Sequence, residues 1–251
     1  MELKKLVPVI IEASRDAGSA IMEVYNSENF NVELKGDESP LTRADTAAHQ
    51  AIVKHLEKTG LPILSEEGRD IPFEERENWE YFWMVDPLDG TKEFIKKNGE
   101  FTVNIALIYK KAPVLGVVYA PVLDKLYVGG KDLDAFLVEG NGKEQLLKRL
   151  PNDSGTTRIV ASRSHLNEDT QNFIDQFEKA ETVSMGSSLK FMLIAESKAD
   201  IYPRFAPTME WDTAAAHAVL RGLDVEVINN EDQKPLRYNK ENLLNPYFLV
   251  R

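Results

Sequence analysis

The spacing of apolar residues changes twice along the 251-residue chain. From residue 3 to 26 they recur every three or four positions, as in an amphipathic helix, and a second such pattern runs from 42 to 59. From 61 to 138 they form short runs typical of strands, and after 155 strand-like and helix-like segments alternate. The pattern predicts an α/β (α+β) fold with two early helices, a β-rich middle and an α/β final part.

The expected elements divide the chain into two lobes. In the β-rich part we expect strands at residues 61–65, 81–85, 101–109, 114–119, 125–128 and 135–138. In the final part we expect strands at 158–161, 182–184, 200–202 and 225–228, alternating with helices at 168–180, 187–198 and 210–221. The polar segment 150–155 is the candidate boundary. We therefore predict an N-terminal α+β lobe, residues 1–150, with helices packed on an antiparallel sheet, and a C-terminal α/β lobe, residues 151–251.

The stretch from Asp86 to Thr91 places two carboxylates where an expected strand gives way to a helix. Pro87 cannot donate to a strand ladder, so we expect the strand to end at Asp86, and Asp89-Gly90 reads as a turn before a helix of residues 91–96. Carboxylate oxygens suit Mg²⁺, and the free N–H groups of a helix start suit a phosphate. An isolated pair of this kind also occurs as a plain strand end and helix cap.

Two further segments place acidic residues at the ends of expected elements. Ser65-Glu66-Glu67 ends a short apolar run, and Glu210-Trp211-Asp212 opens a helix. Each segment alone could be an ordinary turn or cap, but sites are often built at such positions. Together with Asp86 and Asp89 they favour a metal and phosphate site.

These three segments resemble the signatures of the inositol monophosphatase-like metal-dependent phosphatases, and the similarity spans nearly the whole chain. Within that superfamily, residues 86–108 and 116–121 resemble the bacterial 3'(2'),5'-bisphosphate nucleotidases, and Lys92-Glu93-Phe94 points to the same branch. The resemblance implies a layered α-β-α-β-α sugar-phosphatase fold. It also implies an enzyme that hydrolyses adenosine 3',5'-bisphosphate to AMP and phosphate.

The resemblance also implies a role for each matching residue. Two or three Mg²⁺ ions are expected, with the ligands Glu66, Asp86, the backbone carbonyl of Leu88, Asp89 and Asp212. Asp45 and Thr91 are expected to orient the attacking water, and Glu66 counts with them as catalytic. The spacing from Thr42 to Asp45 also fits a helix capping box.

A bisphosphate has a second anionic group that needs its own partners. Ser187 and Lys190 lie three apart near the start of an expected helix and share one of its faces. The resemblance adds Arg204 and His165 as nucleotide contacts. The expected substrate-binding residues are then Glu66, Leu88, Asp89, Gly90, Thr91, His165, Ser187, Lys190, Arg204 and Asp212. We expect His49 and His55 to be surface or packing residues.

Two other functions stay open at this point. An inositol monophosphatase or another sugar phosphatase of the same fold would differ in how residues 162–204 hold the leaving group. A phosphate-binding or regulatory protein without turnover would need the fold but not the chemistry. The positions that the family needs for chemistry, Asp45 and Thr91 among them, carry the expected residue types, which argues against a protein without turnover.

Charge and cysteine content narrow the partners and the location. The net charge of −11 argues against binding a nucleic acid polymer. The resemblance implies a small phosphorylated nucleotide as the partner. With no cysteine, disulfides and thiolate sites are excluded. We find no signal peptide or transmembrane segment and expect a cytoplasmic protein. Peripheral association with the inner membrane and a homodimer both stay open.

Overall fold

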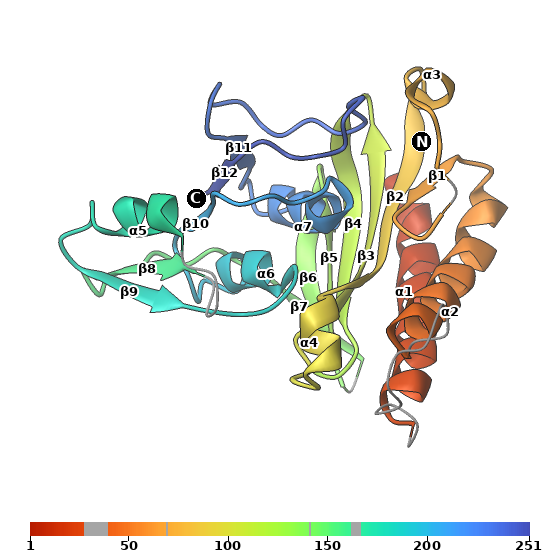
Figure 1. Cartoon of the computed structure of the whole chain (residues 1–251), viewed down its shortest axis with the longest axis horizontal. Coiled ribbons are helices and arrows are strands. Elements are labelled where there is room, and N and C mark those ends of the chain that lie inside the picture. Colours follow the sequence, from red (N-terminus) through yellow and green to blue (C-terminus); the bar gives the residue numbers. More distant parts are fainter. Residues whose placement is uncertain (28–39, 69, 141, 162–166) are drawn as a thin grey trace.

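The computed structural model describes residues 1–27, 40–68, 70–140, 142–161 and 167–251. Its helices and sheets lie in successive layers (Figure 1). Helices α1 and α2 form the first layer, a seven-stranded sheet the second, and helices α6 and α7 the third. Two smaller sheets follow, and α5 lies beside them, at the side of the molecule away from the large sheet. This order confirms the expected layered fold.

The first two layers come from the N-terminal part of the chain. Its helices are α1 (Leu3–Tyr25), α2 (Pro40–Leu56), the 3-10 turn η2 (Glu57–Thr59), α3 (Phe73–Arg76) and α4 (Thr91–Ile95). Its strands are β1 (Ile63–Ser65), β2 (Tyr81–Asp89), β3 (Thr102–Tyr109), β4 (Ala112–Ala120), β5 (Lys125–Gly130), β6 (Leu133–Glu139) and β7 (Lys143–Leu146). They follow chain order across the sheet, and only β1 and β2 run parallel to each other.

The C-terminal part supplies the remaining layers. Its elements are β8 (Thr157–Val160), α5 (Glu168–Ile174), β9 (Ala180–Val183), α6 (Leu189–Ala195), β10 (Tyr202–Arg204), α7 (Trp211–Arg221), β11 (Val227–Asn229) and β12 (Phe248–Val250). Strand β8 pairs with β9 in parallel, and β12 lies between β10 and β11 in antiparallel pairing.

Strand β2 is buried on both faces of the large sheet, and its side chains alternate between two cores. Trp83 and Val85 pack in the core with α1 and α2, whereas Phe82 and Met84 pack in the core with α6 and α7. Asp86 follows Phe82 and Met84 on the same face of the strand. Its carboxylate therefore faces the side of the sheet on which α7 lies.

Helix α7 packs directly on the backbone of β4. A Cβ placed on Gly116 would lie 2.4 Å from the backbone oxygen of Ala215. Only glycine permits this approach, which fixes the distance between the start of α7 and the large sheet.

The structure corrects the end that we expected for β2. Strand pairing with β3 continues beyond Pro87 as far as Asp89, which pairs with Thr102 after an irregularity in the register. A bulge of this kind accommodates the missing N–H of proline. It also turns Asp86 and Asp89 toward the same region, although both belong to one strand.

Three elements of the final part also differ from expectation. The helix expected at 168–180 ends at Ile174, and Phe177 then packs on the same small core as Ile174 while the chain turns toward β9. The helix expected at 187–198 spans only seven residues because Ser187 and Ser197 adopt left-handed backbone angles, with φ of 44° and 57°. Strand β12 pairs with residues of β10 and β11 that lie 19 to 48 positions earlier, and we did not expect it.

The boundary between the two expected lobes stays a prediction. One core joins Met84 and Ala106 of the large sheet to Val160 and Phe248 of the final part. Among the described residues, no helix is both long and apolar enough to cross a membrane.

Candidate active site

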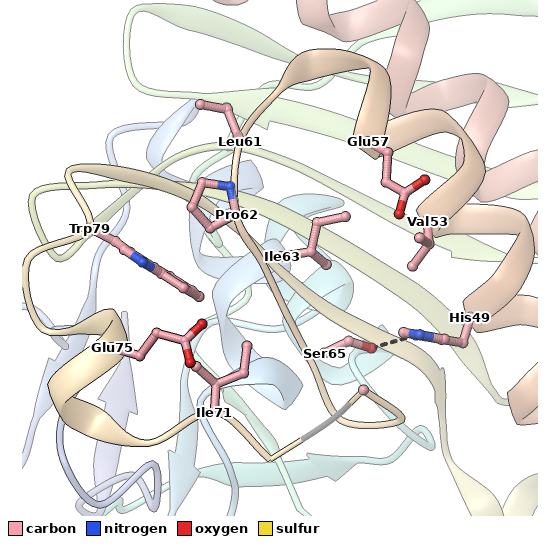
Figure 2. A pocket seen from close by; sticks show the side chains of 11 residues that line it. His49, Val53, Glu57, Leu61, Pro62, Ile63, Ser65, Ile71, Glu75 and Trp79 are labelled. Atoms are coloured by element: carbon pink, nitrogen blue, oxygen red, sulfur yellow. Dashed lines mark hydrogen bonds between the residues drawn. The ribbon is translucent and has the colours of Figure 1, made fainter.

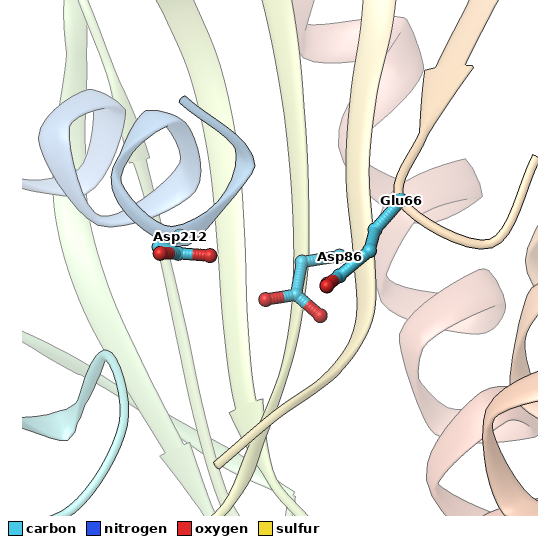
Figure 3. A group of neighbouring side chains, drawn as sticks. All are labelled: Glu66, Asp86 and Asp212. Atoms are coloured by element: carbon cyan, nitrogen blue, oxygen red, sulfur yellow. The ribbon is translucent and has the colours of Figure 1, made fainter. Parts of the chain in front are cut away.

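Three carboxylates from distant parts of the chain meet at one edge of the large sheet (Figure 3). Glu66 follows β1, Asp86 lies near the end of β2, and Asp212 lies in the first turn of α7. One oxygen atom from each lies within 4.8 Å of one atom from the other two. The fold thus brings Asp212 to Glu66 and Asp86, which precede it by more than a hundred positions in the sequence.

The parallel pairing of β1 and β2 explains how Glu66 reaches Asp86. Ser65 pairs with Val85, and the N–H of Glu66 donates to the carbonyl of Val85 at 3.1 Å. The next residue of each strand, Glu66 and Asp86, therefore lies beside the other at the carboxyl ends of the strands. Asp86 is 1% exposed, and its Oδ1 accepts from the N–H of Leu88 at 3.0 Å.

Asp89 is held by hydrogen bonds from the start of α6. Its Oδ2 accepts from the backbone N–H of Ser188 at 2.6 Å and lies 2.8 Å from the Ser188 hydroxyl. The same hydroxyl lies 2.9 Å from the backbone oxygen of Asp212 and accepts from Asn104 Nδ2 at 3.0 Å. Ser188 thereby ties β2, β3, α6 and α7 together around the carboxylates.

The carboxylates raise one another's pKa. Burial raises the pKa of Asp86 well above its usual range, and the charges of Asp89 and Glu66 add to this. Burial and the charge of Asp89 raise the pKa of Asp212 to about 7. For Asp89, burial raises the pKa, although the charge of Lys190 and the hydrogen bonds from the hydroxyl and the backbone N–H of Ser188 oppose the rise. Like charges held this closely require protons or cations to coexist.

Asp45 lies on α2 next to this cluster. Burial and the charges of Glu67 and Glu66 raise its pKa to about 8. Asp45 also contributes to the raised pKa of Asp86, so the four groups share one electrostatic environment. Thr91 is exposed and begins α4 immediately after Gly90, whose φ is 101°. The pairing of Thr91 with Asp45 stays a prediction.

A cavity of about 160 Å³ adjoins the carboxylates. Asp89 and Asp212 form part of its wall, and the cationic side chains of Lys190 and Arg204 line it as well. Gly90 and Ser187 also line it, together with Glu93, Ser188, Phe191, Tyr202, Thr208 and Thr213. One cavity therefore combines acidic, cationic and hydroxyl groups.

Lys190 and Arg204, which we call the cationic wall, are partly desolvated, and the neighbouring Ser187 has a strained backbone. Burial lowers the pKa of Lys190, against the opposing charge of Asp89. Arg204 donates to the carbonyl of Pro207 at 3.1 Å, but its buried Nε lacks a hydrogen-bond partner among the described residues. Ser187 is almost fully buried in a left-handed conformation. Such strain and unmet hydrogen bonding are typical of binding sites.

The structure brings most of the expected site residues to one place. Glu66, Asp86 and Asp212 form the carboxylate cluster, Leu88 and Asp89 follow on the same strand, and the cavity contains Gly90, Ser187, Lys190 and Arg204. His165 lies outside the described residues.

Sequence reasoning missed two supporting residues. Ser188 stood in a segment that we considered, but only Ser187 was singled out. Asn104 is 1% exposed and interrupts an otherwise apolar strand, and that interruption was the available signal. Both residues act through partners 84 to 99 positions away.

The donor set fits a divalent cation. Its side-chain atoms are all carboxylate oxygens, the ligand type that Mg²⁺ prefers, and their raised pKa values show that the folded chain leaves their mutual repulsion uncompensated, which a bound cation would neutralise in place of protons. Sulfur and imidazole ligands, which softer metals prefer, do not occur in the cluster Glu66, Asp86 and Asp212.

Comparison with known proteins agrees with this geometry. The model of the inositol monophosphatase family matches residues 2–246. The 3'(2'),5'-bisphosphate nucleotidase CysQ of Escherichia coli K12 is 46% identical over 246 residues, covering 96% of this chain and 97% of that protein. CysQ of Haemophilus influenzae is 36% identical and covers 98% of this chain and 92% of its own length.

Solved structures show the same fold. The crystal structure of CysQ from Bacteroides thetaiotaomicron has a TM-score of 0.94 and 44% identity and covers 100% of this chain and 98% of that one. An inositol monophosphatase from Zymomonas mobilis, at 22% identity, has a TM-score of 0.78 and covers 100% and 93%. The chain therefore belongs to the inositol monophosphatase family, together with the CysQ proteins.

Proposed function

We propose that this chain is a magnesium-dependent phosphatase that converts adenosine 3',5'-bisphosphate to AMP and phosphate. One observation carries the proposal: a single cavity is lined by Asp212 of the carboxylate cluster, by the neighbouring Asp89 and by two cationic side chains. The carboxylates suit a metal-bound phosphate that is hydrolysed, whereas Lys190 and Arg204 suit a second phosphate that is kept. The names of the CysQ relatives support the same substrate class.

Metal binding falls to the carboxylate cluster. We assign Glu66, Asp86, the Leu88 carbonyl, Asp89 and Asp212 as the ligands of two or three Mg²⁺ ions. The acidic cluster can hold a metal, and the family depends on one. When bound, Mg²⁺ would act as a Lewis acid on the phosphate oxygens. It would also lower the pKa of a water molecule, which can then lose a proton and attack. The protein's own contribution is to hold these oxygen ligands in place through Ser188 and the paired strands.

Asp45 and Thr91 orient the attacking water in this proposal. The Asp45 carboxylate accepts a proton from the water, whose oxygen then forms the new bond to phosphorus while the bond to the ribose 3'-oxygen breaks. As it leaves, the ribose oxygen takes up a proton from solvent, and Asp45 returns its own proton to solvent before the next turnover. In the cation-free chain, burial and the charges of Glu67 and Glu66 raise the pKa of Asp45 to about 8, and bound Mg²⁺ would oppose this rise so that the carboxylate can accept the proton.

Substrate selectivity falls to the cationic wall of the cavity. Ser187, Lys190 and Arg204 face the space beside Asp89 and Asp212, so they can hold the 5'-phosphate while the 3'-phosphate reacts. His165 is proposed as a further nucleotide contact. An inositol monophosphate has no second phosphate for these cations to bind.

Phosphate release from a substrate panel tests the proposal. We expect fast, Mg²⁺-dependent release from adenosine 3',5'-bisphosphate, much slower release from inositol 1-phosphate, and none in EDTA. Asp89→Asn and Asp45→Asn should each lower kcat at least about a hundredfold. Asp134→Asn, an exposed position on β6, is the matched control and should leave the rate unchanged. Faster release from inositol 1-phosphate, or unchanged rates in both site variants, would contradict the proposal.

A further inference from the structure

A histidine outside the carboxylate cluster joins α2 to the turn that carries Glu66. His49 lies on α2, and its Nδ1 is 2.9 Å from the hydroxyl of Ser65, at the end of β1 (Figure 2). Ser65 is 7% exposed. This hydrogen bond thus fixes a buried group directly beside Glu66.

The turn after β1 is short and carries two negative charges. The N–H of Gly68 donates to the carbonyl of Ser65 at 3.1 Å, which closes a turn with Glu66 and Glu67 at its centre. His49 lies close to both the first and the last residue of this turn. Its Nδ1 contacts the Ser65 hydroxyl, and a Cβ placed on Gly68 would be 3.8 Å from its ring.

The same face of α2 carries Asp45. Asp45 and His49 are four residues apart on one helix, so their side chains project in the same direction. The charges of Glu66 and Glu67 raise the pKa of Asp45, so the Asp45 carboxyl lies close to the same turn. Helix α2 therefore approaches the turn through both residues, and the His49–Ser65 contact is a direct hydrogen bond.

The turn also borders open space next to His49. A cavity of about 500 Å³ is lined by His49, Ser65 and Gly68 and extends to Ile63 and Trp79 (Figure 2). Side chains that border such a space do not hold the turn from that direction. Repulsion among Glu66, Glu67 and the neighbouring carboxylates acts to open the turn, and the hydrogen bond opposes it.

We propose that His49 is a positioning residue: it locks the turn of residues 65–68 to α2 and so holds the Glu66 carboxylate in place for a divalent cation. The inference rests on the proposed function, since it assigns Glu66 as a ligand. His49 itself contacts neither metal nor substrate. Its effect passes through Ser65.

Direct measurement of cation binding tests this role without relying on turnover. Titration calorimetry with Mg²⁺, and with Mn²⁺ as a second probe, is carried out on wild type, His49→Ala and Glu66→Gln. We expect His49→Ala to weaken binding by about tenfold, the lower end of what loss of a supporting group around a metal site costs. His49→Asn should recover most of the affinity, because its amide nitrogen can occupy the place of Nδ1.

Two controls separate positioning from stability. His55 lies on the same helix and contacts Asp16 of α1 at 2.7 Å, so His55→Ala should leave cation affinity unchanged. Ser65→Ala removes the same hydrogen bond from the other side and should weaken binding as much as His49→Ala, with no further loss in the double variant. Since the cavity already borders His49, the alanine variant enlarges an existing space rather than creating a closed void.

The outcomes distinguish this inference from the proposed function. A wild-type protein that binds no divalent cation would overturn both. Wild-type binding that Glu66→Gln weakens but neither His49→Ala nor Ser65→Ala changes would overturn the positioning role alone. Equal losses in His49→Ala and His55→Ala would also overturn it, because they would show a general effect of destabilising α2.

Discussion

Removing divalent cations should make the free energy of unfolding of this protein fall as the pH rises from about 4 to 8. In EDTA the clustered carboxyls must either hold protons or repel one another. The pKa of Asp212 is raised to about 7 and that of Asp45 to about 8, whereas both ionise near pH 4 in an unfolded chain. The native state therefore binds more protons than the unfolded state between about pH 4 and 8.

The sign and size of the effect follow from proton linkage. A raised native pKa gives stability that is present in full below the unfolded pKa and is lost as pH rises through the native one. Each carboxyl that keeps its proton lowers the free energy of unfolding by up to about 1.4 kcal/mol per pH unit. Because Asp45 and Asp212 retain some solvent contact, we expect a total of about 1 kcal/mol per pH unit between pH 6.5 and 8. Burial lowers the pKa of His49 and His217, so their opposing effect lies below this window.

Saturating Mg²⁺ should remove this pH dependence. A ligand at a hundred times its Kd adds about 2.7 kcal/mol to the free energy of unfolding, which for a chain of this length raises Tm by about 5 to 10 °C. The rise should be larger at pH 8 than at pH 6.5, because at the lower pH the cation must displace protons.

Urea denaturation and scanning calorimetry at pH 6.5, 7.2 and 8, in EDTA or Mg²⁺ at equal ionic strength, measure both effects. Asp212→Asn removes one charge and should reduce the pH dependence in EDTA as well as the response to Mg²⁺. The exposed Asp134→Asn should do neither. The reasoning is refuted if unfolding in EDTA is equally costly at pH 6.5 and 8, or if NaCl stabilises as much as Mg²⁺.

Three substitutions test other parts of the structure. Lys190→Met should raise KM for adenosine 3',5'-bisphosphate by about tenfold, as expected for loss of one charged hydrogen bond, and should change KM for a monophosphate less. Equal changes in KM for both substrates in steady-state kinetics would contradict a role of Lys190 in binding the second phosphate. Glu210 is fully buried and pairs with Lys240, so Glu210→Gln should lower the urea-measured free energy of unfolding by about 2 to 3 kcal/mol, and a loss below about 1 kcal/mol would show that the pair matters little. Gly116→Ala should cost about 1 to 3 kcal/mol because its Cβ would press on Ala215; an unchanged Tm would contradict this.

Local sequence patterns predicted the early helices and the central strands well. Helix α1 and the end of the second helical segment at Gly60, with φ of 69°, follow from apolar spacing and from glycine's freedom to adopt a left-handed conformation. The short helix α6 could not be predicted in this way, because the backbone angles of Ser187 and Ser197 are imposed by contacts with distant segments. Strand β12 likewise exists only through its partners.

The carboxylates of the site could be found from sequence because each one lies close to the end of a strand or the start of a helix. Asp86, Glu66 and Asp212 carry that signal locally. Ser188 and His49 do not, since a serine near a helix start and a histidine on a helix are ordinary in isolation. Their importance comes from hydrogen bonds to Asp89 and Ser65, and those partners are adjacent only in the folded chain.

The charge of the whole molecule adds a constraint on the order of binding. With a net charge of −11, and with ionised carboxylates lining the cavity, the protein would repel a bisphosphate that arrived before any cation. Lys190 and Arg204 can attract one phosphate, but Asp89 and Asp212 would then repel the other across a space of only about 160 Å³. Cations therefore have to enter first, and substrate affinity should depend on Mg²⁺ even in a variant such as Asp45→Asn that binds without turning over.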